Sequence, residues 1–161
     1  MKNQIDENEC CPKFDPAPWN EKTFHWDNKK FIQDRVRTFF YIPLNFGSVM
    51  TRSVKKIEDA KAKMLEGVVL SESTSKWNMD LYIAVDQHIH NAENTTMNGK
   101  FVSKVYEGSF QNMGIWMKDF EQFAQAKKLS LTKTYMWYTT CPQCAKKYGK
   151  NYVVIVGKLA D

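Results

Sequence analysis

Hydrophobic and polar positions follow the same order in two stretches of the chain, residues 35–86 and residues 100–158. Each stretch is typical of a strand, then a helix, then two further strands. In the segment "DLYIAV", for example, Leu81 and Tyr82 fall on opposite faces of an alternating strand. The repeat predicts duplicated β-α-β-β units that form one antiparallel sheet with two helices on one face. The expected fold class is α+β.

The helices are predicted from apolar residues at helical spacing. The first is expected to use Ser48 as its N-cap and to end at Gly67. The second is expected over residues 111–127. Its inner stripe consists of Met113, Trp116, Met117, Phe120, Phe123 and Ala124. Pro43 cannot donate to a strand ladder, so the strand before the first helix must bulge or lie at an edge there.

The N-terminal stretch has a different composition. Residues 1–30 contain three prolines, which disfavour regular structure, and four aromatic rings, which a disordered tail would not carry. We therefore expect an irregular arm over residues 1–30, anchored by its rings on a single domain that spans residues 31–161. Whether this arm gates a site on the domain is an open hypothesis.

Charge and hydropathy exclude several classes of partner. The 161 residues include 23 Lys and Arg against 18 Asp and Glu, a net charge of +5, and the basic residues form no stripe. Nucleic-acid binding is therefore not expected. No apolar run approaches the roughly 18 residues of a membrane helix, so no membrane partner is expected either. The polar, acidic start of the chain is unlike a signal peptide and predicts a cytoplasmic protein. The oligomeric state is left open.

Four cysteines offer a metal site. Cys141 and Cys144 have the spacing of a zinc knuckle or of a redox pair, and they fall in a loop between predicted strands, which favours the knuckle. A structural zinc needs four ligands, and Cys10 and Cys11 would supply the other two. The alternative is four reduced structural thiols, as a reducing compartment predicts. No other cofactor is expected.

The second stretch, "KVYEGSFQNMGIWMKDFEQFAQAKKLSLTKTYMWYTTCP" with "NYVVIVGKL", resembles the second repeat of the gyrase-inhibitor-like (GyrI-like) small-molecule-binding domain. "RTFFYIPLNFG" and "DLYIAV" fit the first repeat, so the resemblance covers residues 35–159. The start "CCP" and the loop "TTCPQCAKKYG" are similar to free-standing members that are often labelled hydrolases. No helix-turn-helix segment precedes the domain, so a regulator role is not expected.

The resemblance implies a cleft between the two repeats, lined by aromatic rings and an acidic residue. Glu107, at the end of a predicted strand, and Asp80 are the candidate acids. Either would attract a cationic ligand or act as a general base or acid in hydrolysis. The aromatic candidates are Trp26, Tyr41, Tyr82, Tyr106, Trp116, Trp137 and Tyr138. The alternative is that the acids face solvent and the rings are core.

Two functions follow from these patterns. The first is binding of a small hydrophobic or aromatic compound, with a cation among the candidates, in the cleft between the repeats. Family resemblance adds hydrolysis of that compound as detoxification. The second is a non-catalytic protein-interaction module with structural thiols or zinc. The two differ in whether an acid and several rings converge on one site.

Overall fold

The computed structural model describes residues 14–139 and 151–160, and the structural statements below concern these residues. The elements run β1 (Lys22–Phe39), β2 (Ile42–Pro43), α1 (Phe46–Asp59), β3 (Met64–Ser73), β4 (Asn78–Val85), β5 (Glu93–Glu107), the short 3₁₀ helix η1 (Phe110–Asn112), α2 (Met113–Ala126), β6 (Leu131–Tyr138) and β7 (Tyr152–Leu159). The sheet is antiparallel at every pairing of the described strands.

The sheet closes on itself. The strand order is β2-β1-β4-β3-β6-β7-β5, and β1 also pairs with β5, so six strands form a closed ring with β2 appended at one edge. The β1–β5 seam is long, running from Lys22 opposite Ser103 to Gln33 opposite Glu93. The β3–β6 seam is short and rests on Ser71 opposite Met136. The serine Oγ donates to the Met136 carbonyl at 3.1 Å, which reinforces this narrow junction.

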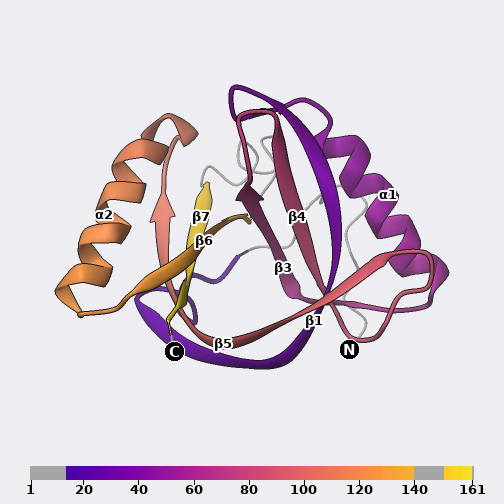
Figure 1. Ribbon diagram of the computed structural model, residues 1–161, viewed down its shortest axis with the longest axis horizontal. Helices are drawn as coiled ribbons and strands as arrows, with labels where there is room; N and C mark the ends of the chain where they lie inside the picture. Colours follow the sequence, from indigo (N-terminus) through magenta and orange to yellow (C-terminus); the bar gives the residue numbers. More distant parts are fainter. Residues whose placement is uncertain (1–13, 140–150, 161) are drawn as a thin grey trace.

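Both helices lie on the outer face of the ring, at opposite sides (Figure 1). α1 packs on β1 and β4 through Val49 and Ile57, and α2 packs on β5 and β7 through Trp116 and Phe120. The inner face carries a third, largely aromatic core. Its buried members are Trp26, Phe31, Val68, Leu70, Tyr82, Ala84, Met97, Phe101, Tyr135, Trp137, Val154 and Val156. The expectation of one antiparallel sheet with both helices on the same face is therefore confirmed.

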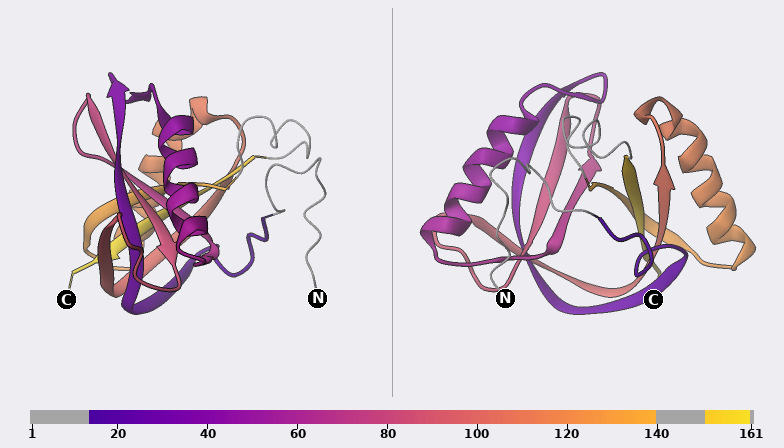
Figure 2. Two further views of the ribbon diagram at one scale, coloured as in Figure 1. Left: turned by 90° about the vertical axis from the view of Figure 1, so that its right-hand side faces the viewer. Right: turned by 180° about the vertical axis from the view of Figure 1, so that it is seen from behind.

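β1 is long enough to serve both halves of the molecule, and Figure 2 shows it curving from one half to the other. A bulge makes this possible. Between Trp26 and Lys29 the register with β5 shifts by one residue, and Asn28 takes a left-handed conformation with φ 51°. Because one extra residue reverses the alternation, Trp26 and Phe31 both face inward although they are five positions apart.

The irregular arm was predicted too long. Residues 22–30 belong to β1, where pairing with β5 satisfies their backbone groups. Pairing with a strand about seventy positions away leaves no local sequence signal, which explains the error. The second predicted stretch began too late, at residue 100, because β5 already begins at Glu93. Pro43 does lie in the edge strand β2, as predicted.

Two helix boundaries also differ from the prediction. α1 begins at Phe46, and its N-cap is Asn45, whose side-chain oxygen accepts the Arg37 N–H rather than capping the helix. The helix ends at Asp59, and Lys61 supplies the left-handed residue beyond it with φ 54°. Gly67, with φ 66°, instead lies in the β3 bulge. The second helix and its buried stripe are confirmed.

Within the described ranges, no helix combines the length and apolar character that crossing a membrane requires. The elements of the two halves run β1-α1-β3-β4 and β5-α2-β6-β7, apart from the two-residue β2 and the short η1. That these halves are copies of one unit stays a prediction.

Candidate functional site

A row of charged side chains crosses the inner face at one end of β1, β4 and β3. Asp80 on β4 lies opposite Arg35 on β1 and opposite Glu72 on β3. Residues directly opposite one another in an antiparallel pair project on the same face about 5 Å apart. The Arg35 Nε lies 3.8 Å from an Asp80 oxygen, and the Asp80 side chain is 14% exposed. Strand register thus places two carboxylates and one guanidinium together.

Two tyrosines lie beside this row on the inner face, Tyr82 on β4 and Tyr135 on β6. Tyr82 follows Asp80 by two residues, and its ring meets that of Tyr135 on β6 edge-on at a centroid distance of 5.9 Å. Burial, followed by the charges of Asp80 and Glu72, raises the pKa of Tyr82 to about 12. Burial and the charge of Glu72 likewise raise the pKa of Tyr135. Both phenols are therefore neutral near pH 7, and each has a hydroxyl hydrogen to donate.

Glu72 stands out chemically. Its Oε2 atom is buried and has no hydrogen-bond partner among the residues that the structure describes. A buried acceptor without a partner costs about 1–3 kcal/mol, so native proteins rarely leave one. Glu72 shares the inner face with Val68 and Leu70, which precede it at alternate positions of β3. A carboxylate at the edge of an apolar and aromatic surface suits a cationic ligand.

The segment before β1 lies against this inner face. Trp19 meets Trp137 edge-on at 5.0 Å, and Phe14 meets the same ring at 5.4 Å. The backbone carbonyl of Trp19 accepts a hydrogen bond of 2.6 Å from the fully buried Ser103 hydroxyl. Asn20 adds a side-chain bond to the Val105 N–H. Part of the predicted arm therefore covers the aromatic inner core, as its rings suggested.

The candidate residues from the sequence divide among several places. Trp26, Tyr82 and Trp137 share the inner face with Asp80. Tyr106, Trp116 and Tyr138 belong to the outer core under α2, on the other side of the sheet. Tyr41 is 57% exposed in the β1–β2 turn. Glu107 ends β5 opposite Tyr152 and is exposed. The structure thus places three of the seven rings on the same face of the sheet as Asp80, with Tyr82 two positions from it on β4.

Tyr106 has a well-defined role in packing. Its hydroxyl donates to an Asp119 oxygen at 2.7 Å, and the Lys104 ammonium binds the same oxygen at 2.7 Å. The Tyr106 ring stacks on Trp116 at 5.7 Å. The hydrogen bonds from Lys104 and then from Tyr106 lower the pKa of Asp119, while burial and the bond to Asp119 raise the pKa of Tyr106. This network ties α2 to β5.

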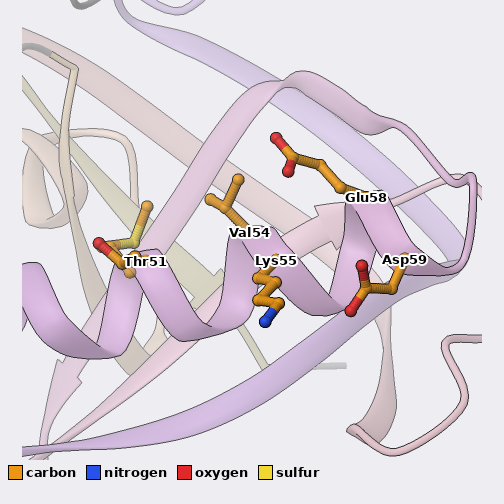
Figure 3. Close-up of a pocket in the computed structure, with 6 residues that line it drawn as sticks. Thr51, Val54, Lys55, Glu58 and Asp59 are labelled. Carbon is orange, nitrogen blue, oxygen red and sulfur yellow. The ribbon is translucent and has the colours of Figure 1, made fainter.

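A depression of about 590 Å³ lies on the surface of α1. Its described lining residues all come from that helix: Met50, Thr51, Val54, Lys55, Glu58 and Asp59. Figure 3 shows five of these side chains projecting from successive turns. The residues that α1 buries against the sheet are Val49, Ser53 and Ile57, so the depression lies along other faces of the helix. Strands β1 and β4 therefore lie between this depression and the charged row of Arg35, Asp80 and Glu72.

The cysteine predictions fall outside the described residues. Cys10, Cys11, Cys141 and Cys144 lie in residues 1–13 and 140–150, so the zinc site stays a prediction. Among the described residues, no group of three or more His, Cys, Asp or Glu side chains is arranged to hold a metal ion.

Sequence reasoning missed Glu72 and Tyr135. The signal for Glu72 was present in "VVLSES", where an acid continues the apolar face of Val68 and Leu70. A charged residue in register with an apolar strand face indicates either a strand end or a functional site. Tyr135 carried no comparable signal, because its proximity to Glu72 depends on the β3–β6 seam.

Comparisons with known proteins agree on the fold. The EcmrR C-terminal domain matches with a TM-score of 0.66 at 9% identity, over 89% of this chain and 98% of that domain. A longer EcmrR chain, in a DNA complex, matches with a TM-score of 0.65 at 8% identity, over 88% of this chain and 57% of its own length. A Listeria innocua protein described as a hydrolase matches with a TM-score of 0.57 at 10% identity, over 88% of this chain and 92% of its own.

Identities this low establish a shared fold, but they do not establish a shared activity. No significant match is found among curated protein sequences. A family model described as "Bacterial hydrolase" matches residues 1–159, nearly the whole chain. The GyrI-like resemblance is thereby confirmed in fold and family, and the chain belongs to the bacterial hydrolase family.

Proposed function

We propose that the protein binds a small hydrophobic cation on the inner face of the ring, beside Glu72. The site lies where the two halves meet, and we interpret these halves as two copies of one β-α-β-β unit. The observation that carries the proposal is the buried Glu72 oxygen without a hydrogen-bond partner in the described part of the chain. A bound cation would pair with this oxygen and offset the cost of burying it.

The surroundings of Glu72 support a flat or aromatic ligand. Tyr82 and Tyr135 present rings on the same face, and Trp137 follows Tyr135 by two positions on β6. Aromatic faces attract cations and stack on planar groups. Asp80 adds a second negative charge, which Arg35 balances only in part because the guanidinium side chain is 68% exposed. The presence of two acids and several rings on one face supports the ligand-binding hypothesis.

The segment before β1 would control access. Phe14 and Trp19 pack on Trp137, so a ligand that stacks on this ring displaces one of them or inserts beside them. This contact gives the gating hypothesis a specific form. The rings of the segment occupy part of the binding surface when no ligand is present.

We further propose that the protein hydrolyses the bound compound. Glu72 would take a proton from a water molecule that attacks the ligand. The neutral Tyr82 hydroxyl would donate a hydrogen bond to the atom on which negative charge develops. Membership of a family described as bacterial hydrolases supports a search for turnover and for a detoxifying role. Binding is the prior step and is tested first.

The test is a calorimetric titration with tetraphenylphosphonium, a lipophilic cation, and with neutral triphenylphosphine oxide. Glu72→Gln removes the charge and preserves the shape. Tetraphenylphosphonium has no hydrogen-bond donor, so only charge attraction is lost. Two unit charges about 6 Å apart attract by roughly 3 kcal/mol at an effective dielectric constant of about 20, and partial exposure lowers this figure, so the affinity for the cation should fall roughly tenfold to a hundredfold. The affinity for the neutral compound should change little.

Glu107→Gln is the matched control, since Glu107 is exposed at the end of β5. It should leave both affinities unchanged. Equal losses in Glu72→Gln and Glu107→Gln, or no saturable binding of the cation by the unaltered protein, would contradict the proposal. The latter result would favour the alternative of a non-catalytic protein-interaction module.

A further inference from the structure

Six large apolar side chains gather on the surface where β1 turns into β2. These residues, here called the aromatic tip, are Phe39, Phe40, Tyr41, Ile42, Leu44 and Trp77, each between 51% and 66% exposed. Figures 1 and 2 both show the β1–β2 turn beside the turn between β3 and β4 at one end of the molecule. Soluble proteins rarely expose so many apolar side chains in one place without a partner.

Three rings of the aromatic tip form one cluster that links the two turns. The Phe39, Phe40 and Trp77 rings contact one another pairwise, with centroids 4.8–5.7 Å apart. Two backbone bonds join the turns: the Thr38 N–H donates to the Trp77 carbonyl at 2.8 Å, and the Tyr41 N–H donates to the Lys76 carbonyl at 3.0 Å. The rings are therefore held in place before any partner arrives.

The turn itself is strained in order to present aromatic residues. Phe40 and Tyr41 have φ values of 46° and 70°, both in the left-handed region. Two-residue hairpin turns with this geometry strongly favour Asn-Gly, because a bulky side chain is disfavoured there. Strain of this kind is typical of functional surfaces rather than of plain turns.

The charged residues within the aromatic tip segments are both positive. Residues 36–48 and 73–79 contain Arg37 and Lys76 and no Asp or Glu, while Arg35, one position earlier, pairs with Asp80. Among the described residues, Arg37 and Lys76 take part in no ion pair. The Lys76 ammonium lies 5.8 Å from the centre of the Phe40 ring, so charge and apolar surface are adjacent.

We propose that the aromatic tip docks on an anionic lipid bilayer, with its rings among the headgroups and its two cations, Arg37 and Lys76, on the lipid phosphates and carboxylates. Trp, Tyr and Phe favour the interface of a bilayer, and each nearby cation strengthens attachment to anionic lipid about fivefold. A second copy of the chain fits less well. In a symmetric contact between two tips, the two cations of one would face the same two cations of the other.

This proposal concerns a surface contact, which needs no spanning segment. It departs from the expectation of no membrane partner, because that expectation rested on the lack of an apolar run long enough to span. It is also independent of the ligand site beside Glu72, which lies on the inner face of the sheet.

The test is co-sedimentation of the full chain with phosphatidylcholine vesicles that contain about 30% phosphatidylserine, a composition rich in anionic headgroups. The double variant Phe40→Asn with Tyr41→Gly removes two rings and installs the residues that the turn geometry favours, so it should fold at least as well as the unaltered chain. Loss of this apolar surface should weaken binding roughly tenfold or more. Lys76→Glu should weaken vesicle binding more than Lys76→Gln does, because it adds a negative charge as well as removing a cation.

Ile115→Gln is the matched control, because Ile115 is 68% exposed on α2 and is not part of the aromatic tip. It should bind vesicles as the unaltered chain does. Trp77 gives a second readout, since it is the one tryptophan that is more than half exposed. Vesicles should shift its emission to the blue and protect it from acrylamide.

Three results would overturn the proposal. One is no sedimentation of the unaltered chain with the anionic vesicles. Another is equal binding to pure phosphatidylcholine, which would remove the role of the cations. The last is a concentration-dependent dimer, without vesicles, that the Phe40→Asn, Tyr41→Gly variant abolishes, since this would assign the aromatic tip to a second copy of the chain.

Discussion

Glu72→Met should make the protein more stable while it removes the proposed ligand contact. The buried Oε2 atom has no hydrogen-bond partner among the described residues, and such an atom costs about 1–3 kcal/mol. Methionine keeps the length and apolar stem of the side chain and fills the space flexibly. Only one of the two carboxylate oxygens is buried in this way, so we expect the lower end, a gain of about 1 kcal/mol.

The assay is equilibrium unfolding in urea followed by circular dichroism. For a urea dependence of about 2 kcal/mol per molar, the midpoint should rise by about 0.5 M with an unchanged slope. Glu107→Met, at an exposed position, should stay within about 0.5 kcal/mol of the unaltered protein. If Glu72→Met lowers the free energy of unfolding by 1 kcal/mol or more, Glu72 supports the fold and the argument for a binding role fails.

Three further changes test the core under α2 and the segment before β1. Gly157→Ala should cost about 1–3 kcal/mol in a urea melt, because the new Cβ would clash with the Leu131 side chain; unchanged stability would show that this contact relaxes freely. Asp119→Asn should lower the free energy of unfolding by at most about 1 kcal/mol at pH 7, since the Asp119 side chain is about half exposed. Because the pKa of Asp119 is lowered in the folded protein, this difference between variant and unaltered protein should disappear as pH falls below about 4. A difference that persists at pH 2 contradicts the assigned charge effect. Trp19→Ala should cost about 1–3 kcal/mol and should raise the affinity for tetraphenylphosphonium by uncovering Trp137; an unchanged affinity excludes gating by Trp19.

Local periodicity predicted the parts of the fold that depend on local sequence. In β4, Leu81 and Ile83 do face α1 while Tyr82 faces inward. In α2, Trp116 and Phe120 lie in the buried stripe that their spacing indicated. Each of these elements buries one face on a neighbour, so the 2-residue or 3.6-residue period is preserved in the sequence.

The remaining parts depend on tertiary contacts that leave a weak local signal. The bulge at Asn28 reverses the alternation of β1, which hides the strand from a test for period two. The Phe40–Tyr41 turn contradicts ordinary turn chemistry, so the sequence reads as one continuous strand there. The convergence of Glu72 and Tyr135 depends on the short β3–β6 seam. The sequence could therefore indicate the site only as a class of residues, with Asp80 and Tyr82 at alternate positions on one face of β4.

The most direct test of the binding site is carbon NMR of the protein with labelled glutamate carboxyl groups. The Glu72 resonance is identified by its loss in Glu72→Gln, and tetraphenylphosphonium is then added stepwise. A cation that binds beside Glu72 should shift this resonance with saturation and leave that of Glu107 unchanged. A saturating shift at other glutamates with none at Glu72 would place the ligand elsewhere and contradict the account.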